Sequence, residues 1–184
     1  MLLGNVNPSG KLPITFPNRE NETDFSPAQW PGLPDPTNPT YANYTEKLLV
    51  GYRFYDHHQI EFTTGFPFGH GLSYTSFDYS ELTTTGEQIH FTIENTGKVA
   101  GAEVAQVYFG FPDSAGEPPR QLKGFEKVFL EPGAKKKVTV KVAKRDKSIF
   151  DVEKMGWSVV SGDFQVFVGS SSRDTRLTGK FTQQ

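Results

Sequence analysis

The second half of the chain consists of short runs in which hydrophobic and polar residues alternate. Residues 88–94 alternate isoleucine and phenylalanine with polar residues, and residues 136–142 alternate valine with lysine and threonine. A period of two residues is typical of a β-strand with one buried face. Turn sequences such as Asn95-Thr96-Gly97 separate the runs. The pattern predicts strands over residues 76–82, 88–94, 102–111, 121–130, 136–142, 157–160, 164–168 and 176–181.

Seven or eight short strands with regular turn signals are typical of a β-sandwich. The sequence therefore predicts an all-β protein with an immunoglobulin-like, fibronectin type III-like sandwich. Trp157 lies in one of the predicted strands, and we expect it in the core. Lys135-Lys136-Lys137 is expected to be a solvated strand edge that resists aggregation.

The first part of the chain has a different pattern, which predicts a proline-rich N-terminal extension. Residues 11–16 follow an Asn-Pro-Ser-Gly turn and have apolar residues at alternate positions, which predicts one strand that must pair with a sheet. Residues 17–43 contain six of the thirteen prolines, so an extended connector is expected there. Residues 44–57 are rich in aromatic and aliphatic side chains and must pack against something. We expect a short helical turn at 44–49, followed by extended chain.

Composition narrows the classes of partner. Of 184 residues 35% are hydrophobic and 14% aromatic, which is enough for a folded core, and the net charge is −2. This balanced charge disfavours nucleic-acid and anionic-membrane partners. The chain has no cysteine, which excludes disulfides and cysteine-ligated zinc. Asn21 and Asn43 head glycosylation sequons, which are usable only in a secretory pathway. We expect a secreted or periplasmic location if the parent protein carries a signal peptide.

No catalytic constellation is evident in the sequence. Ser73 lies in a glycine-rich turn but lacks the spacing of a nucleophile elbow. His57 and His58 follow Asp56, yet no second ligand pair lies at a recognisable spacing, so we expect no metal site and no cofactor. Asp24, Glu46, Asp56 and Glu61 lie among turns and connectors, where solvation explains carboxylates without a glycosidic role.

Sugar binding without catalysis is an alternative, because exposed aromatic rings can stack on pyranose rings. Trp30 lies in a polar stretch of the connector, and Tyr52 and Arg53 lie in the aromatic stretch that follows. We treat these three residues as candidate carbohydrate contacts. The simpler interpretation of Trp30 is that it pins the connector to a domain, because burial dominates the behaviour of aromatic side chains.

Five ordered motifs resemble the C-terminal region of glycoside hydrolase family 3. They are GNVNPSGKLPITFP at 4–17, YTEKLLVGYRFYDH at 44–57, FPFGHGLSYTSF at 66–77, the NTG turn and GAEVAQVY strand within 95–108, and LKGFEK at 122–127. One departure is Lys47, where the family often has glycine. The resemblance implies a remnant of an α/β-sandwich strand region at 1–17, an interdomain connector at 18–65 and a fibronectin type III-like domain at 66–184.

The resemblance also implies a role. Family members are mostly β-glucosidases and other exo-acting glycosidases, whose aspartate nucleophile and glutamate acid/base lie on two domains upstream of the first motif. We therefore expect this chain to be a non-catalytic part, inactive alone, that stabilises catalytic domains, its main partners. Two alternatives are a free-standing carbohydrate-binding or surface-interaction module, which would bind polysaccharide, and a strand-swapped homo-oligomerisation module that uses strand 11–16.

Overall fold

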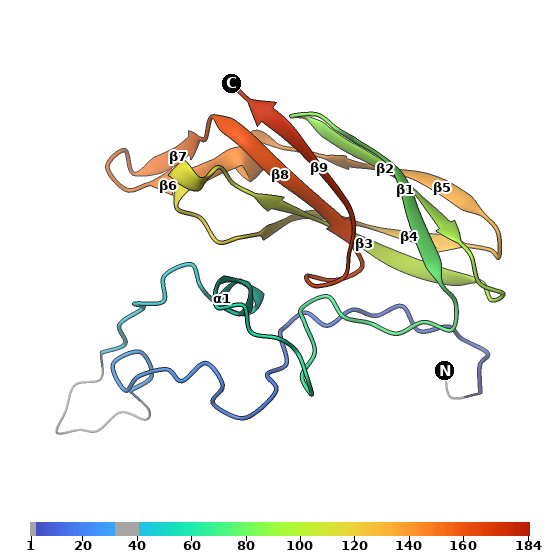
Figure 1. Ribbon diagram of the computed structural model, residues 1–184, viewed down its shortest axis with the longest axis horizontal. Coiled ribbons are helices and arrows are strands. Elements are labelled where there is room, and N and C mark those ends of the chain that lie inside the picture. Colours follow the sequence, from blue (N-terminus) through green and yellow to red (C-terminus); the bar gives the residue numbers. More distant parts are fainter. Residues whose placement is uncertain (1–2, 32–40) are drawn as a thin grey trace.

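The computed structural model describes residues 3–31 and 41–184, which form a β-sandwich with an irregular layer beneath it (Figure 1). The class is all-β, as predicted. Pro34, Pro36 and Pro39 of the predicted connector lie outside the described residues. In the rest of the connector, at 18–31 and 41–50, the chain makes turns and no helix or strand, as its proline content predicts.

Two antiparallel sheets form the sandwich. One has three strands in the order β1-β2-β5, and the other has four in the order β4-β3-β8-β9, while β6 and β7 form a separate hairpin. No helix among the described residues is long and apolar enough to cross a membrane. The strands are β1 (Phe77–Thr84), β2 (Gln88–Asn95), β3 (Gly101–Gly110), β4 (Gln121–Leu130), β5 (Lys135–Lys141), β6 (Ser148–Asp151), β7 (Gly156–Val159), β8 (Gly162–Gly169) and β9 (Thr175–Gln183).

The core lies between the two sheets and consists of the inward positions of the alternating strands. Ile89 and Phe91 of β2 are fully buried. Facing them across the sandwich, the rings of Phe109, Phe164 and Phe181 form a cluster, with the parallel pair Phe164–Phe181 at a centroid distance of 5.1 Å. The two-residue period therefore identified the buried face, because successive side chains of a strand point to opposite sides.

The hairpin β6–β7 corrects the expectation for Trp157. Its side chain is 49% exposed and does not belong to the core. Strand β7 pairs with β6 and joins neither sheet, so its residues lie beside the sandwich. The ring is covered on one side by the guanidinium of Arg145, 3.2 Å from the ring centroid. Strand β6 was not predicted, whereas its equally short partner β7 overlaps the strand predicted at 157–160.

The stretch after residue 50 is helical where extended chain was expected. Helix α1 (Tyr52–His57) begins after Gly51, whose φ of 60° turns the chain. Tyr52 and Tyr55 are both buried, Tyr52 against Tyr108 of the sandwich and Tyr55 against Phe62 of the connector. The predicted helical turn at 44–49 is a pair of tight turns, closed by Lys47 N to Tyr44 O and by a second hydrogen bond two residues later.

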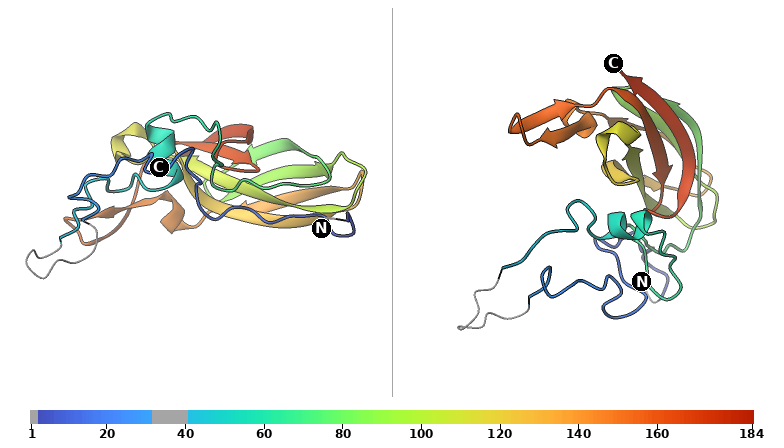
Figure 2. Two further views of the ribbon diagram at one scale, coloured as in Figure 1. Left: turned by 90° about the horizontal axis from the view of Figure 1, so that it is seen from below. Right: turned by 60° about the vertical axis from the view of Figure 1, so that its left-hand side comes forward.

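The predicted strand at 11–16 has found a partner within the chain, although it joins neither sheet. Phe16 and Phe66 form an isolated antiparallel bridge, with both backbone hydrogen bonds at 2.9–3.0 Å. Leu12 N donates to His70 O, and Gly69 N donates to Leu12 O. Figure 2 shows these two segments running side by side below the sandwich. The two glycine-containing motifs therefore form one ribbon.

Candidate interdomain interface

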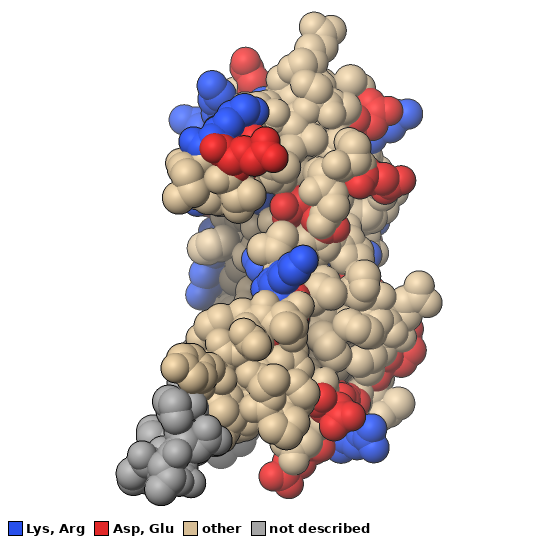
Figure 3. All heavy atoms as spheres, turned by 90° about the vertical axis from the view of Figure 1, so that its left-hand side faces the viewer, with Lys and Arg blue, Asp and Glu red and all other residues tan. Residues whose placement is uncertain are grey.

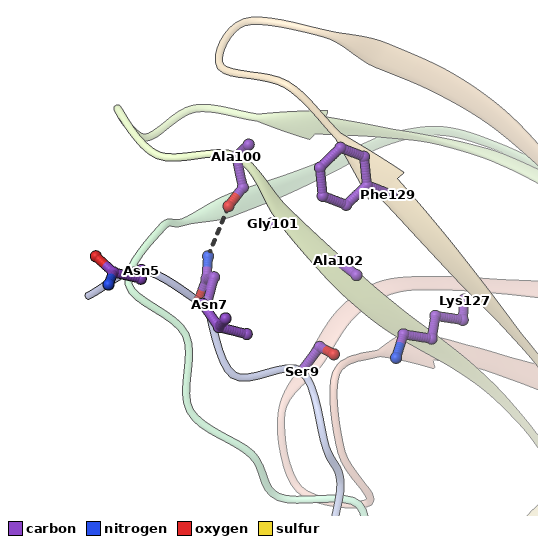
Figure 4. Close-up of a pocket in the computed structure, with 9 residues that line it drawn as sticks. Asn5, Asn7, Ser9, Ala100, Gly101, Ala102, Lys127 and Phe129 are labelled. Carbon is purple, nitrogen blue, oxygen red and sulfur yellow. Dashed lines mark hydrogen bonds between the residues drawn. The ribbon is translucent and has the colours of Figure 1, made fainter. Parts of the chain in front are cut away.

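The N-terminal segment is attached to the sandwich by the side chain of Asn7. Its amide nitrogen donates to Ala100 O at 3.0 Å, and its amide oxygen accepts from Tyr74 N at 2.9 Å and from the Ser73 hydroxyl at 3.1 Å. Figure 4 shows Asn7 pointing at Ala100 across a pocket whose far side carries Phe129 of β4. One asparagine thus joins the first motif, the third motif and the start of β3.

An ion pair fixes the next turn of the same segment. Lys11 Nζ lies 3.0 Å from Glu103 Oε1 of β3, and the two side chains are only 15% and 8% exposed. Because few waters reach this pair, it is less screened than a surface salt bridge and orients the segment along β3.

A left-handed glycine meets a buried glutamine beside this ion pair. Gly69 has a φ of +80°, and a Cβ there would lie 2.2 Å from Gln106 Oε1. Gln106 Nε2 donates to Gly69 O at 3.2 Å and to Ser170 O at 2.7 Å, while Tyr108 donates its hydroxyl proton to Gln106 Oε1. Every polar atom of the buried amide is therefore satisfied only if residue 69 lacks a side chain.

Helix α1 docks on the sandwich through Tyr52. Its ring stacks on Phe68, with a centroid distance of 5.0 Å, and meets Tyr108 edge to face at 5.8 Å. Its hydroxyl oxygen accepts a hydrogen bond of 2.9 Å from Leu122 N at the start of β4. The second motif is thus an anchor for the connector, and Tyr52 is an interior packing residue.

The same helix places a buried carboxylate between two arginines. Asp56 is 6% exposed at its side chain and lies 2.8 Å from Arg173 Nε and 3.7 Å from Arg120 Nε. Burial raises the pKa of Asp56 above its ordinary value, and the two guanidinium groups act against that effect. Arg173 also donates to Ile60 O at 3.0 Å, and Arg120 donates to Ser172 O at 3.0 Å. The cluster joins α1 to two loops of the four-stranded sheet, the β3–β4 loop that carries Arg120 and the β8–β9 loop that carries Arg173.

Asn18 closes the connector on itself. Its amide oxygen accepts from the backbone nitrogens of residues 63, 64 and 65 at 2.7–3.1 Å, and its amide nitrogen donates to Glu61 O and to the carboxylate of Glu22. Glu22 in turn accepts a 2.6 Å hydrogen bond from the Tyr55 hydroxyl, which is the main reason that the pKa of Glu22 lies below its ordinary value.

Uncovered apolar side chains gather on this layer. A shallow groove of about 610 Å³ opens between the paired segments and is lined by Leu12, Phe16, Phe66, His70 and Leu72. In Figure 3 the connector region, beside the grey atoms, presents a broad uncharged surface. An apolar surface of this extent is typical of an interaction site. The exposed apolar residues of the layer are Leu3, Val6, Ile14, Phe16, Phe25, Trp30, Tyr41, Tyr44, Leu48, Val50, Phe66, Leu72 and Tyr74.

The candidate carbohydrate contacts are dispersed. Trp30 is 75% exposed in the connector, whereas the ring of Tyr52 lies in the interior. Arg53 points into a separate pocket on another side of α1. The structure therefore does not bring the three together, and sugar binding by any of them stays a prediction.

The described residues show no assembled catalytic or metal-binding group. Ser73 donates its hydroxyl proton to Asn7 and so serves the turn. Among residues 3–31 and 41–184, no group of three or more histidines, cysteines and acidic residues could hold a metal ion. Sequence reasoning missed Arg120, Arg173 and Gln106 as members of the interface, since each meets its partner only across the fold.

Comparison with known proteins identifies the region. A fibronectin type III-like domain model matches residues 103–172. A probable β-glucosidase D of Aspergillus niger is 39% identical over 208 aligned residues, which cover 100% of this chain and 26% of the relative. A Streptomyces venezuelae β-glucosidase solved with D-glucose aligns with a TM-score of 0.90 at 37% identity, over 100% of this chain and 24% of that one. A family 3 β-glucosidase of Bifidobacterium adolescentis aligns with a TM-score of 0.86 at 34% identity, over 99% of this chain and 27% of that one. The chain thus spans about a quarter of the length of the relatives it matches.

Proposed function

Since the chain corresponds over its whole length to a C-terminal region of the family 3 β-glucosidases, with their fibronectin type III-like domain, we propose that it buttresses the catalytic domains of such an enzyme. It has no nucleophile or acid/base of its own and hydrolyses no substrate alone. We also propose the division into a strand-region remnant at 1–17, a connector at 18–65 and the sandwich domain at 66–184.

The observation that carries this proposal is the apolar layer below the sandwich. Its backbone is held rigidly by Asn7, Lys11 and Gln106, while Leu12, Phe16 and neighbouring apolar side chains still face outward. A fixed layer with an uncovered apolar surface is suited to a rigid partner domain, because little conformational entropy is lost on docking. The motifs of this layer are joints that set the angle between the sandwich and what it supports.

An activity assay tests the absence of catalysis. The purified chain should release no nitrophenol from aryl β-glucosides or aryl β-xylosides. Turnover that disappears when one internal carboxylate is changed to its amide would refute the proposal.

A binding experiment tests the docking surface. The purified chain is mixed with the remaining part of the Aspergillus niger relative, and complex formation is followed by sedimentation velocity. Leu72→Asp should weaken the complex at least about tenfold, because it buries a charge in an apolar contact. Val152→Asp is a matched control, since both side chains are 73% exposed and Val152 lies in the β6–β7 turn. Equal effects of the two substitutions, or no complex at all, would contradict this role.

A second candidate function is carbohydrate binding by the connector, which the exposed ring of Trp30 favours. Titration calorimetry with soluble glucans and xylans should then give saturable heat that Trp30→Ala removes. The third alternative, strand-swapped oligomerisation, has less support, because the backbone of Leu12 and Phe16 is already hydrogen-bonded to the third motif. A mass that rises with concentration in solution would favour it again.

A further inference from the structure

A second pocket shares no residue with the Asp56 cluster or with the apolar groove. It has a volume of about 430 Å³ and is formed by α1, the start of β4, the short helix η2 (Lys144–Lys147) and the hairpin β6–β7. This volume falls within the range of small-molecule sites. Figure 3 views the molecule from the side of this hairpin, where lysine and arginine side chains gather above the uncharged connector surface.

Three cations line this pocket, and none is in an ion pair among the residues that the structure describes. Arg53 Nε is buried and has no hydrogen-bond partner. The Lys123 ammonium donates one long hydrogen bond of 3.3 Å to the Gln121 amide oxygen and lies 4.8 Å from the centroid of the Phe111 ring, and burial lowers the pKa of Lys123. Arg145 lies over the ring of Trp157. A buried, unpaired guanidinium nitrogen leaves a donor whose missing acceptor a ligand can supply.

The two carboxylates at the pocket, Asp146 and Glu117, offset only part of this positive charge. Asp146 Oδ2 accepts from Ala143 N at 2.7 Å and so caps η2. Glu117 accepts from the side-chain amide of Gln121. Three cations against two carboxylates leave one excess positive charge in a partly desolvated space, where Coulomb interactions are stronger than in water. The pocket is therefore complementary to a monoanion.

The remaining wall is aromatic. Phe150 and Trp157 meet edge to face, with a centroid distance of 5.5 Å, and both rings are about half exposed to solvent. Exposed rings beside hydrogen-bond donors suit a ligand that has an apolar face and a polar rim, as a pyranose has. We propose that this pocket binds an acidic monosaccharide of the uronic-acid class, with its carboxylate at Arg53 and Lys123 and its ring against the aromatic wall.

This site shares Leu48 with the apolar layer and no residue with the groove, and binding of a small ligand here does not depend on the proposed docking role. Titration calorimetry of the full 184-residue chain with glucuronate should give saturable binding, with a Kd of about 1 mM, a strength typical of one small ligand. Glucose and acetate are the matched probes, since each carries only one half of the recognised chemistry. Both should bind at least about tenfold more weakly.

Two charge changes of opposite sign test the assignment. Lys123→Met keeps the aliphatic stem and should weaken glucuronate binding about tenfold, whereas Glu117→Gln should strengthen it about threefold. Lys137→Met, an exposed lysine of β5, is the control and should leave the Kd unchanged. The fluorescence of Trp157, read in a Trp30→Phe background that leaves one indole, should saturate at the same concentrations.

Three comparisons between ligands or variants would overturn the proposal. They are equal binding of glucose and glucuronate, equal binding of acetate and glucuronate, and identical effects of Lys123→Met and Lys137→Met. Absence of saturable heat with a flat Trp157 signal would also overturn it, because the folded pocket would then lack the affinity that its charges predict.

Discussion

Replacement of Asp56 by asparagine should detach α1 from the sandwich without unfolding the core. Asparagine keeps the shape of the side chain but leaves Arg120 and Arg173 without their buried counter-charge. Removal of one partner of a buried ion pair costs about 3–5 kcal/mol. Two features place Asp56→Asn at or just below the lower end, about 2–3 kcal/mol: burial already disfavours the charged carboxyl group, and each arginine keeps a backbone carbonyl acceptor.

The cost should appear locally, because no residue of α1 belongs to the core cluster between the sheets. Hydrogen exchange is therefore the assay, and the reporter is Leu122 N, which donates to the Tyr52 hydroxyl oxygen. A cost of 2–3 kcal/mol corresponds to exchange about 30- to 150-fold faster at this amide. The amides of Ile89 and Phe91 in β2 should keep their wild-type rates.

A matched control separates this cluster from an ordinary surface pair. Glu94→Gln breaks the exposed salt bridge to Lys135, which solvent screens, so little or no cost is expected. The reasoning would be refuted if Asp56→Asn changed exchange at Leu122 no more than this control does. It would also be refuted if the substitution accelerated exchange in β2 equally, since α1 would then be part of the cooperative core.

Three further predictions concern the joints. Gly69→Ala should destabilise the chain by about 2 kcal/mol or more in urea unfolding, because the new Cβ meets a buried amide side chain at 2.2 Å; Gly116→Ala, also at positive φ but with nothing within 4 Å, should cost only about 1 kcal/mol. Lys47→Gly should raise stability by about 0.5 kcal/mol, since Lys47 has a φ of 52°, and an unchanged or lower urea midpoint would contradict this. Because the pKa of Glu22 is lowered, the stability that its carboxylate contributes is fully present above the ordinary pKa of 4.5 and is lost as the pH falls through the lowered pKa. Proteolysis of the connector should therefore accelerate on acidification, and Glu22→Gln should abolish this pH dependence. A pH dependence that persists in Glu22→Gln would exclude the hydrogen bond from Tyr55 as its cause.

The sandwich was predictable because buried and exposed positions alternate along its strands, and this alternation is visible in neighbouring residues of the sequence. The strand at 121–130 has the predicted bounds, and Ile89 and Phe91 lie on the predicted face. Trp157 shows the limit of this reasoning: its strand is real, but hydrophobicity alone does not say whether a strand joins the main sheets or a side hairpin. The helix at 52–57 escaped prediction because six residues are too few for a helical period, and its formation depends on tertiary packing of Tyr52.

The interface was predictable in its segments and not in its contacts. The order of the motifs marked the segments that pack below the sandwich. The partners of Asp56 lie at positions 120 and 173, and no local pattern announces a pair so distant in sequence.

The sequence by itself therefore determined the all-β class, the approximate strands, the proline-rich connector and the family resemblance, because each depends on neighbouring residues or on motif order. Only the tertiary structure decided that the strand-like segment at 11–16 pairs with the third motif, that α1 is bound through a buried carboxylate, and that three unpaired cations face one pocket. These features depend on which distant side chains share a desolvated space. The charge, hydrogen-bond and packing energies that select them exist only once the chain has folded.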